Sequence, residues 1–525
     1  MPENTNRWTR YLELASLAVG IGLRVGRYLE PRPLWIDEVF IALNVLPRSP
    51  LDFLRPLDHN QISPLGFLVG EWLVTRVAGA GEHALRFLPL VASVVALIAF
   101  ARFVRRTLEP RTALLATTLA ALSPLLIIYA GEVKSYAFDW LFVVLLMNAT
   151  LSLAESTTPA AWIRWSVTAG LAALMSTAAP FFVAGCAFSL LAVPAIRRSA
   201  REWVRLAVAV APAAILFGVQ LLTTYSSDVT GPEMKLFWAS HMLDPRLPDA
   251  VVQAAQLSRL FILEVLFGDR NIDVLPPKSM TIIMLISAVG VLALARRSVL
   301  LVLMVVAPAT LAVVASLLQV WPLTARLLLF AAPFVFVALA AGMAALTRLL
   351  PSRPGEVAFA GLSVLLVVVC SAGLRREWPA SRWFVAVPDA LRPVHRDIGT
   401  NATVYFSTDI VHACQYYLGW HPDREELGAD TTRTDCALLG TTTLSGNWPL
   451  FSYPAGKPPF IRPEWLDQEG SRVLAAAPEK VWLLLGRIVQ LNDSLPAWLE
   501  RRGLRRVGER QERTFLLIEY SKGPG

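Results

Sequence analysis

Apolar runs separated by short basic segments occupy the first 374 residues of the chain. A run of about 20 apolar residues can cross a bilayer as a helix, so the pattern predicts about eleven transmembrane helices. The first follows Arg7 and Arg10 and is interpreted as a membrane helix rather than a cleaved signal, because no A-x-A site follows closely. The other ten runs lie at about 84–101, 112–130, 136–154, 162–178, 180–195, 204–223, 280–295, 299–318, 324–347 and 356–373.

Two more segments, at 62–78 and 252–268, are apolar enough to compete with these runs. When both are left out and the N-terminus is placed inside, the arginine clusters around 102–111, 197–205 and 348–353 fall on the inner side, as the positive-inside rule requires. We therefore expect the two segments to lie at the interface or to pack within the protein. This topology assigns to the outer face the residues 30–83, 131–135, 224–279, 319–325 and everything after 374.

The C-terminal part of the chain is more polar. Short apolar runs at 403–407, 480–486 and 514–520 predict strands, and the segment 495–505 predicts a helix. Strands that alternate with helices are typical of a small α/β domain. We thus expect a transmembrane catalytic domain over 1–374 with helices at its outer face, and a soluble extracytoplasmic α/β domain over 375–525. The segment 372–400 resembles a linker with amphipathic pieces.

Composition agrees with a polytopic membrane protein. Of the 525 residues, 55% are hydrophobic and 17% are charged, and the mean hydropathy is +0.51. These values exclude a disordered chain and a small disulfide scaffold, and they argue against a single soluble globule. The net charge of +8 does not require a nucleic-acid partner, because Lys and Arg flank membrane helices.

The four cysteines fall into two pairs by context. Cys186 and Cys370 lie in apolar runs and are expected in the core. Cys414 and Cys436 lie in the polar C-terminal region and could form a disulfide if that region faces an oxidising compartment. Spacing alone leaves both outcomes open. No CxxC or HExxH run supports a zinc site.

Two adjacent carboxylates, Asp37 and Glu38, follow the first predicted membrane helix. One interpretation is a helix N-terminus, with Asp37 as the N-cap and Glu38 favoured by the helix dipole. The other is a general base at the membrane surface. Position alone leaves both interpretations open.

Two further polar groups lie where the topology expects the outer face. Asp-His-Asn-Gln at 58–61 precedes the apolar segment near Pro64, and by itself it is interpreted as a turn before a helix. In the second group, Glu132 and Lys134 are compatible with a surface ion pair of little energetic value. Asp139 lies inside an apolar run, where a charge costs on the order of 2.5–3.5 kcal/mol, so it is a candidate functional residue, with a structural ion pair as the alternative.

Arg326 follows Trp321-Pro-Leu-Thr-Ala and begins another apolar helix from the outer side. Its side chain either reaches the interface or binds a phosphate through its forked donors. Because all four groups share one face in the expected topology, together they predict a cleft with carboxylates that accept a proton and cations that hold a phosphate.

In its order of motifs the sequence resembles the GT-C superfamily of membrane glycosyltransferases, in particular the bacterial relatives of protein O-mannosyltransferases and lipid A aminoarabinose transferases. The motifs are the Asp-Glu pair, D-H-N-Q-x-x-P-L, A-L-R-F-L-P at 84–89, E-V-K-x-Y-x-x-D and a late Arg. The resemblance is strongest over about 10–155, weaker near 320–345, and does not obviously cover 375–525. Ser63-Pro64 departs from the common double proline of the family.

This resemblance implies that a sugar is transferred from a polyprenyl phosphate to an envelope lipid, glycan or protein, on the outer face of a bacterial cytoplasmic membrane and usually with inversion. It implies that Asp37 is the catalytic base and that Glu38 supports it or binds the sugar. The positions implied to hold the donor phosphate are His59, Lys134 and Arg326. Those implied to shape the sugar or metal side of the cleft are Glu132, Tyr136 and Asp139. Some relatives hold a divalent metal near these acids and others need none, so no cofactor is certain.

Other classes of protein fit the sequence less well. A transporter or flippase of lipid-linked sugars would share the many helices, but we find no paired inverted halves with broken helices. A non-catalytic scaffold would leave Asp139 unexplained. We expect the soluble part to help admit or select the acceptor. The loop 224–279, with Glu233, Lys235 and His241, either covers the cleft or lies in solvent.

Overall fold

The structure, a computed structural model, describes residues 2–225, 237–246, 249–268, 277–378, 387–397, 402–432, 436, 438, 441–447, 451–452, 460–476, 480–486, 489–511 and 515–522. Contacts divide the chain into two compact units, and each is described below by itself. The first unit comprises residues 1–30, 49–71 and 86–380, and the second comprises 31–48, 72–85 and 381–525. The segment that carries Asp37 therefore packs with the C-terminal part of the chain.

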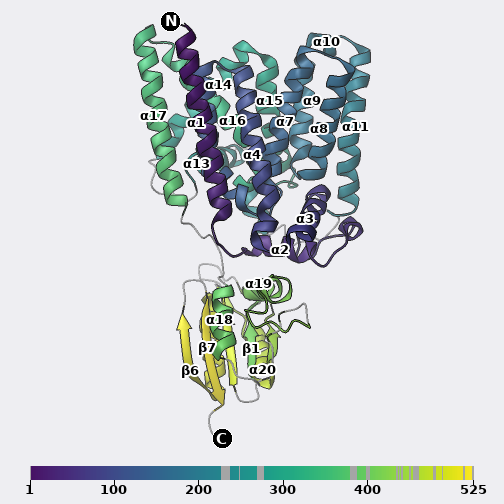
Figure 1. Cartoon of the computed structure of the whole chain (residues 1–525), viewed down its shortest axis with the longest axis vertical. Helices are drawn as coiled ribbons and strands as arrows, with labels where there is room; N and C mark the ends of the chain where they lie inside the picture. The colour runs from purple at the N-terminus through teal and green to yellow at the C-terminus, as the bar shows by residue number, and fades with distance from the viewer. Residues whose placement is uncertain are drawn as a thin grey trace. The chain divides into compact units, whose positions relative to one another are not determined.

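Helices build the first unit and run side by side, with the N-terminus and α10 at the same end (Figure 1). The last residues of α3 and the first of α4 belong to the second unit. The helices of this part of the chain are α1 (Pro2–Leu29), η1 (Pro50–Leu54), α3 (Leu65–Ala78), α4 (Glu82–Thr107), α5 (Pro110–Leu122), α6 (Pro124–Ile128), η2 (Tyr129–Gly131), α7 (Tyr136–Glu155), α8 (Pro159–Met175), α9 (Ala179–Ser189), η3 (Leu190–Ala192), α10 (Pro194–Arg197), α11 (Ala200–Leu222), η5 (Ala239–His241), α13 (Asp249–Phe267), α14 (Pro277–Arg297), α15 (Val299–Leu317), η7 (Ala325–Ala331), α16 (Ala332–Thr347) and α17 (Ser352–Glu377).

Proline and serine residues set the starts of several of these helices. Pro110, Pro124 and Pro159 each occupy an early helical position, where a missing N–H leaves no hydrogen bond unmade. The hydroxyls of Ser199 and Ser298 accept the backbone N–H three residues further on and cap α11 and α15. The chain can therefore end one apolar helix and begin the next within a few residues.

α7 and α16 form the buried centre of the first unit. By contrast, α11, α14 and α17 expose rows of large aliphatic side chains, as expected of helices that face lipid. α14 packs closely on α16 at Gly290 and Gly342, where an added Cβ would overlap a backbone carbonyl oxygen of the other helix. Glycine at these two positions lets the helix backbones approach each other.

Among the described residues, eight helices are long and apolar enough to cross a membrane, and the bent pair of α5 with α6 and η2 would make a ninth. The eight are α4, α7, α11, α13, α14, α15, α17 and η7 with α16. The segments expected near the N-terminus and at 162–178 and 180–195 are helical as α1, α8 and α9 but are not among the eight. α13 is among them, although the charge pattern favours an interfacial place for it. The chain is a multi-pass membrane protein, and the count of eleven spans stays a prediction.

The basic connections of the first unit gather at one end of the bundle. Ion pairs join different helix ends there, and each adds little stability by itself. These pairs are Arg105–Glu13, Arg106–Glu155, Arg111–Glu356 and Arg348–Glu109. Arg111–Glu356 and Arg348–Glu109 bring the segments around 102–111 and 348–356 together, and Arg105–Glu13 holds the first of these beside the first half of α1. This is expected if these connections share one side of the membrane.

The C-terminal part of the second unit is a small α/β domain. Its main sheet has the strand order β2-β1-β5-β7-β6, in which β1 is parallel to β2 and β5, and β7 is antiparallel to β5 and β6. Thr403 of β1 lies opposite Thr442 and Val481. The elements of the second unit are α2 (Ile36–Val45), α18 (Val387–Asp397), β1 (Thr403–Phe406), α19 (Thr408–Gly419), β2 (Thr442–Ser445), β3 (Phe451–Ser452), β4 (Phe460–Ile461), α20 (Pro463–Ala476), β5 (Lys480–Leu485), α21 (Val489–Arg501), β6 (Leu504–Gln511) and β7 (Leu516–Lys522).

The strands expected at 403–407, 480–486 and 514–520 are confirmed as β1, β5 and β7. The helix expected at 495–505 is wrong at its end. α21 stops at Arg501, Gly503 adopts a φ of 94°, and Leu504 begins a strand. β6 lies at the edge of the sheet and buries little besides Leu504. Its sequence is therefore polar and lacks the apolar run by which β1, β5 and β7 are predicted.

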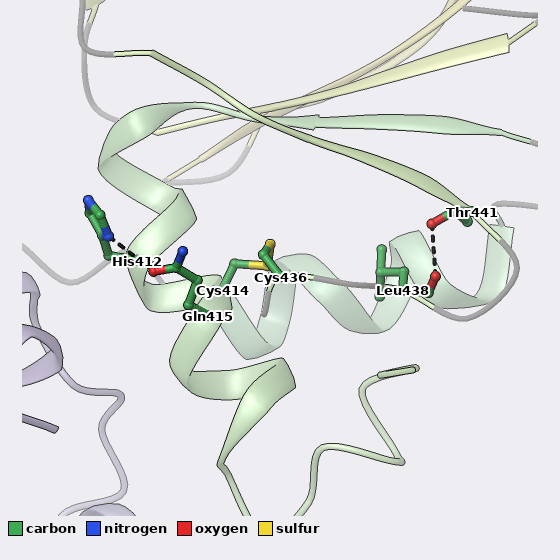
Figure 2. The surroundings of a disulfide bond; sticks show 6 residues. All are labelled: His412, Cys414, Gln415, Cys436, Leu438 and Thr441. Carbon is green, nitrogen blue, oxygen red and sulfur yellow. Dashed lines mark hydrogen bonds between the residues drawn. A yellow bond between two sulfur atoms is a disulfide. The ribbon is translucent and has the colours of Figure 1, made fainter. Parts of the chain in front are cut away.

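A disulfide joins Cys414 of α19 to Cys436 (Figure 2). The two Cα atoms are 5.3 Å apart, a spacing that suits a disulfide. The bond ties α19 to the segment that precedes β2. Cys186 and Cys370 are free and buried, as expected of core residues.

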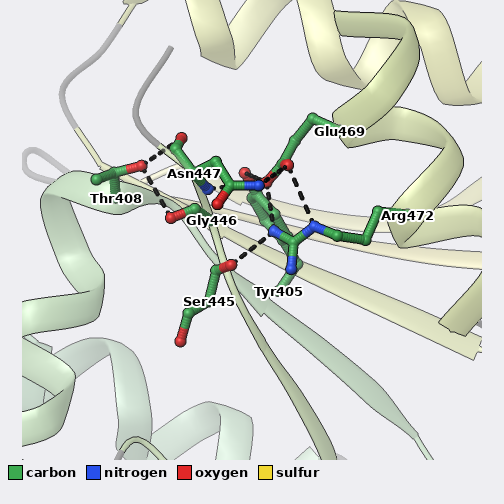
Figure 3. Close-up of polar contacts among 7 residues, drawn as sticks. All are labelled: Tyr405, Thr408, Ser445, Gly446, Asn447, Glu469 and Arg472. Atoms are coloured by element: carbon green, nitrogen blue, oxygen red, sulfur yellow. Dashed lines mark hydrogen bonds and ion pairs between the residues drawn. The ribbon is translucent and has the colours of Figure 1, made fainter. Parts of the chain in front are cut away.

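A buried carboxylate, Glu469 of α20, ties three parts of the domain together (Figure 3). It accepts hydrogen bonds from the Tyr405 hydroxyl of β1 and from the backbone and side chain of Asn447, which follows β2. Arg472 donates to the same carboxylate and to the Ser445 carbonyl. Hydrogen bonds of this kind offset the cost of burying a charge.

Candidate active site

Lys134 and Gln61 bring together the two polar groups expected at the outer face. The Lys134 ammonium donates a hydrogen bond of 2.6 Å to the side-chain oxygen of Gln61. Lys134 and Glu132 are both only 7% exposed, so neither is the solvent-exposed residue that the surface interpretation requires. An ammonium has three N–H donors, and the contact with Gln61 uses one of them.

The chain around His59 has an unusual backbone. His59 and Asn60 have φ angles of 61° and 53°, the left-handed region that residues other than glycine rarely adopt. The side-chain amide of Gln61 donates to the His59 carbonyl at 3.1 Å, and thus supports this turn. Strained backbone of this kind often marks a binding or catalytic segment.

Asp139 lies in the first turn of α7 and is 1% exposed. Its Oδ1 accepts a 2.6 Å hydrogen bond from the Ser176 hydroxyl, which follows α8. Within the described residues, Asp139 forms no ion pair, and its Oδ2 is buried without a hydrogen-bond partner. The alternative of a structural ion pair is therefore not supported. The nearby Tyr225 has a raised pKa because of burial and because of the Asp139 carboxylate.

Gln220 of α11 connects the ends of three helices. Its Oε1 accepts the Leu65 N–H at 2.7 Å, at the start of α3, and its Nε2 donates to the Ala173 carbonyl of α8 at 2.7 Å. The Tyr225 hydroxyl also donates to it, at 3.4 Å. The segment that contains Gln61 and leads into α3 is thus fixed to α8 and α11.

Arg326 is the second residue of η7, and η7 packs against α7. The guanidinium lies 5.2 Å from the centre of the Trp238 ring, a cation–π contact. The His241 ring stands edge-on to the same Trp238 ring, with 5.8 Å between the centroids. Burial and the positive charge of Arg326 both lower the pKa of its imidazole. The His241 carbonyl accepts the Leu323 N–H at 2.8 Å, so the long loop and the 319–325 connection meet here. Glu233 and Lys235 of that loop lie outside the described residues.

Asp37 and Glu38 belong to the second unit. Trp35 occupies the N-cap position of α2, and Asp37 is its second residue, so the expectation that Asp37 is the N-cap is wrong. Glu38 is fully buried, and its Oε2 accepts the Trp35 N–H at 3.1 Å. Glu38 thus holds the helix start, while Asp37 remains partly exposed.

Several buried charged residues escaped the sequence analysis, among them Arg24, Arg86 and Glu71. Arg24 is fully buried in α1, where it donates to the Ser93 hydroxyl and lies over the Trp140 ring. Arg86 of the A-L-R-F-L-P motif and Glu71 of α3 are also buried. The cost of a charge within an apolar run is a usable signal for Arg24, just as it is for Asp139.

Tyr136 is buried, and its ring stands edge-on to that of Tyr129, with 5.1 Å between the centroids. In the described part of the chain, no three His, Cys, Asp or Glu side chains gather closely enough to hold a metal ion.

A family model described as dolichyl-phosphate-mannose-protein mannosyltransferase matches residues 63–221. No curated protein matches the sequence. Two solved structures of ArnT from Cupriavidus metallidurans are each 12% identical, with 98% of both chains covered. The apo state has a TM-score of 0.49 and the state bound to undecaprenyl phosphate one of 0.47. The Archaeoglobus fulgidus oligosaccharyltransferase in complex with Zn and sulfate is 13% identical, with 97% of this chain and 73% of that chain covered and a TM-score of 0.50.

At such low identity, the likeness to the Archaeoglobus enzyme concerns the fold alone. The family match is different in kind, because it rests on sequence and includes Glu132, Lys134 and Asp139. The sequence match and the fold together confirm the resemblance of this multi-pass membrane protein to the GT-C superfamily of membrane glycosyltransferases.

Proposed function

We propose that the chain transfers a sugar from a polyprenyl-phosphate donor to a hydroxyl group of an envelope acceptor. The observation that carries this proposal is the buried Lys134 ammonium, which lies within the segment that matches the mannosyltransferase family and donates to Gln61, just before that segment. The description of that family names a dolichyl phosphate as the sugar carrier. A lipid-linked phosphate is an anion, and a fixed cation such as Lys134 can stabilise it.

In the proposed reaction, the acceptor oxygen attacks the anomeric carbon of the sugar while the bond from that carbon to the phosphate oxygen breaks. Asp37 accepts the hydroxyl proton, and the electron pair of the broken bond stays on the departing phosphate. Attack from the face opposite the phosphate inverts the anomeric centre. A positioned carboxylate base contributes about 10²–10⁴-fold to such a rate.

Three side chains are proposed to hold the departing phosphate: His59, Lys134 and Arg326. The charge that develops on the phosphate oxygen is stabilised by fixed cations, and the loss of one such donor typically costs about 10²–10³-fold in kcat. Gln61 fixes the direction of the Lys134 side chain, and the Trp238 ring supports the Arg326 guanidinium.

The sugar side of the site is proposed to include Asp139, Glu132 and Tyr136. Among the described residues, Ser176 takes up one oxygen of Asp139 and the other lacks a hydrogen-bond partner. A sugar hydroxyl can donate to that oxygen. Glu38 is proposed to support Asp37 through the backbone, since it accepts the Trp35 N–H.

We further propose that the reaction takes place outside the cytoplasm of a bacterium, at its inner membrane. The gathering of arginine-rich helix ends near the first half of α1 supports an inner location for those ends. The disulfide between Cys414 and Cys436 supports an oxidising surrounding for residues 375–525. In this scheme the catalytic part is 1–374, with the Asp37 segment on the outer face.

The test is sugar transfer by purified membranes, with labelled polyprenyl-phosphate sugars as donors and an envelope extract as acceptor. We expect transfer by the native chain and its near-complete loss in Asp37→Asn. Asp493→Asn, the same change at an exposed site on α21, should transfer normally. Full activity of Asp37→Asn would remove Asp37 from the mechanism. Donor binding without transfer to any acceptor would instead indicate a protein that moves lipid-linked sugars.

A further inference from the structure

α19 of the C-terminal domain packs on α2, the helix that carries Asp37, within the second unit. The central contact is made by Tyr417, whose side chain is fully buried. The Leu34 N–H donates to the Tyr417 hydroxyl at 2.8 Å, and this hydroxyl donates to Glu82 Oε1 at 2.9 Å. The Tyr417 hydroxyl therefore connects the segment before α2 to the start of α4.

The backbone N–H groups of Leu34 and of the next residue, Trp35, both donate to side chains. The next backbone N–H, that of Trp35, donates to Glu38. Two consecutive N–H groups are thus fixed just before Asp37, which is the second residue of α2. Because each residue has only two soft backbone dihedrals, fixing both groups restricts the direction in which the Asp37 side chain leaves the helix.

Other contacts hold α19 against the same two segments. The His421 Nε2 lies 2.9 Å from the second oxygen of Glu82, and the Tyr416 hydroxyl donates to the Ala80 carbonyl at 2.6 Å. The His412 ring stands edge-on to Phe40 of α2, with 5.2 Å between the centroids. The disulfide at Cys414 anchors α19 within its own domain.

We propose that α19 is a built-in positioning element of the transferase and that Tyr417 is a positioning residue for Asp37. This inference rests on the proposed role of Asp37 as the base. Tyr417 touches neither donor nor acceptor in this proposal, and acts through the backbone at Leu34. The C-terminal domain then serves the chemical step itself, in addition to any part it has in selecting the acceptor.

The test compares Tyr417→Phe with Tyr520→Phe in the full-length protein in detergent. Tyr520 is a matched control, because it is also a buried tyrosine of the same domain, and its hydroxyl donates to Glu500. The first measurement is amide hydrogen exchange of the peptide that covers Leu34 and Trp35. The second is transfer kinetics with varied donor concentration.

We expect faster exchange at Leu34 and Trp35 in Tyr417→Phe and native exchange there in Tyr520→Phe. We also expect kcat to fall about 10- to 100-fold in Tyr417→Phe with an unchanged KM for the donor, since a small misplacement of a catalytic group costs on that order. If Tyr417→Phe loosened the fold in general, amide exchange would be faster throughout the domain and not only at Leu34 and Trp35. Unchanged exchange at Leu34, or an unchanged kcat, would overturn the inference.

If Tyr417→Phe does not fold, a second pair of variants, at Glu82, tests whether the Tyr417 hydroxyl positions Asp37. Glu82→Gln keeps an oxygen for the Tyr417 hydroxyl and should retain most of the native kcat, whereas Glu82→Leu should lose it. Equal activity of the two would contradict the inference. If the native chain transfers no sugar, the proposed function fails, and hydrogen exchange alone still tests whether Tyr417 holds the segment before Asp37.

Discussion

The Lys134 ammonium lies 2.6 Å from the side-chain oxygen of Gln61, and this contact joins the loop before α3 to the connection before α7. The same amide group donates to the His59 carbonyl, in the stretch of left-handed backbone. The Gln61 side chain therefore connects the Lys134 ammonium to the turn at His59 by hydrogen bonds. The arrangement separates the charge of Lys134 from its positioning, and the two can be tested apart.

Lys134→Met should lower kcat/KM by about 10²–10³-fold, because it removes a charge proposed to face the donor phosphate but keeps an unbranched side chain. Gln61→Ala should cause a smaller loss, since the charge remains but is held less firmly. Steady-state transfer with a labelled donor measures both effects, with gel filtration as the check on folding. Native activity of Lys134→Met would contradict a role in phosphate binding, and a larger loss in Gln61→Ala would assign the main role to the turn.

Gln220→Leu should destabilise the first unit by about 1–3 kcal/mol, because it leaves the Leu65 N–H and the Ala173 carbonyl without this partner. The measurement is the apparent melting temperature of the purified protein in detergent. Thr223→Val is the control, because the Thr223 hydroxyl donates within its own helix segment, to the Val219 carbonyl. Equal melting temperatures for Gln220→Leu and the native protein would show that this link contributes nothing to stability.

Strands of the α/β domain can be predicted from the sequence where the whole strand is buried. β1 and β5 are apolar along almost their whole length because the sheet buries them, so a short apolar run suffices to detect each. β6 has an edge position and a row of exposed charged residues, and no local pattern distinguishes it from the end of a helix. Its strand character depends on pairing with β7, which is a tertiary contact.

Some residues of the candidate site can also be predicted from the sequence, and others cannot. Lys134 and Asp139 stand out in the sequence because a charge is costly in apolar surroundings. Ser176 and Gln220 do not, because a single uncharged polar residue at the end of an apolar helix is ordinary. Their importance comes from partners elsewhere in the chain, Asp139 for Ser176 and Leu65 for Gln220. Such long-range partnerships become visible only in the folded chain.

The disulfide predicts a specific labelling pattern for the four thiols. After unfolding without reductant, a maleimide reagent should modify Cys186 and Cys370, which are free. Cys414 and Cys436 should react only after reduction. Protein extracted from native membranes under acid quench and analysed by mass spectrometry gives the count. Four modified cysteines without reduction would contradict both the bond and the oxidising location proposed for this domain.

Glu469 predicts how stability responds to acid. Burial raises the pKa of its carboxyl, but hydrogen bonds from Arg472 and Asn447 outweigh burial, and the pKa lies below its ordinary value of 4.5. The folded protein therefore binds this proton less readily than the unfolded chain does. The stability that Glu469 contributes is fully present above about pH 4.5 and is lost as the pH falls through the lowered pKa of the folded state.

Melting temperatures of the native protein and of Glu469→Gln, measured in detergent from pH 7 to pH 3.5, test this expectation. The difference between the two should be constant at the upper end and should shrink below about pH 4.5, because protonation removes the charge that the variant already lacks. Glu464→Gln provides the control, since Glu464 lies on the same helix but is exposed. A difference that persists unchanged to pH 3.5 would mean that Glu469 stabilises the domain by its shape and hydrogen bonds rather than by its charge.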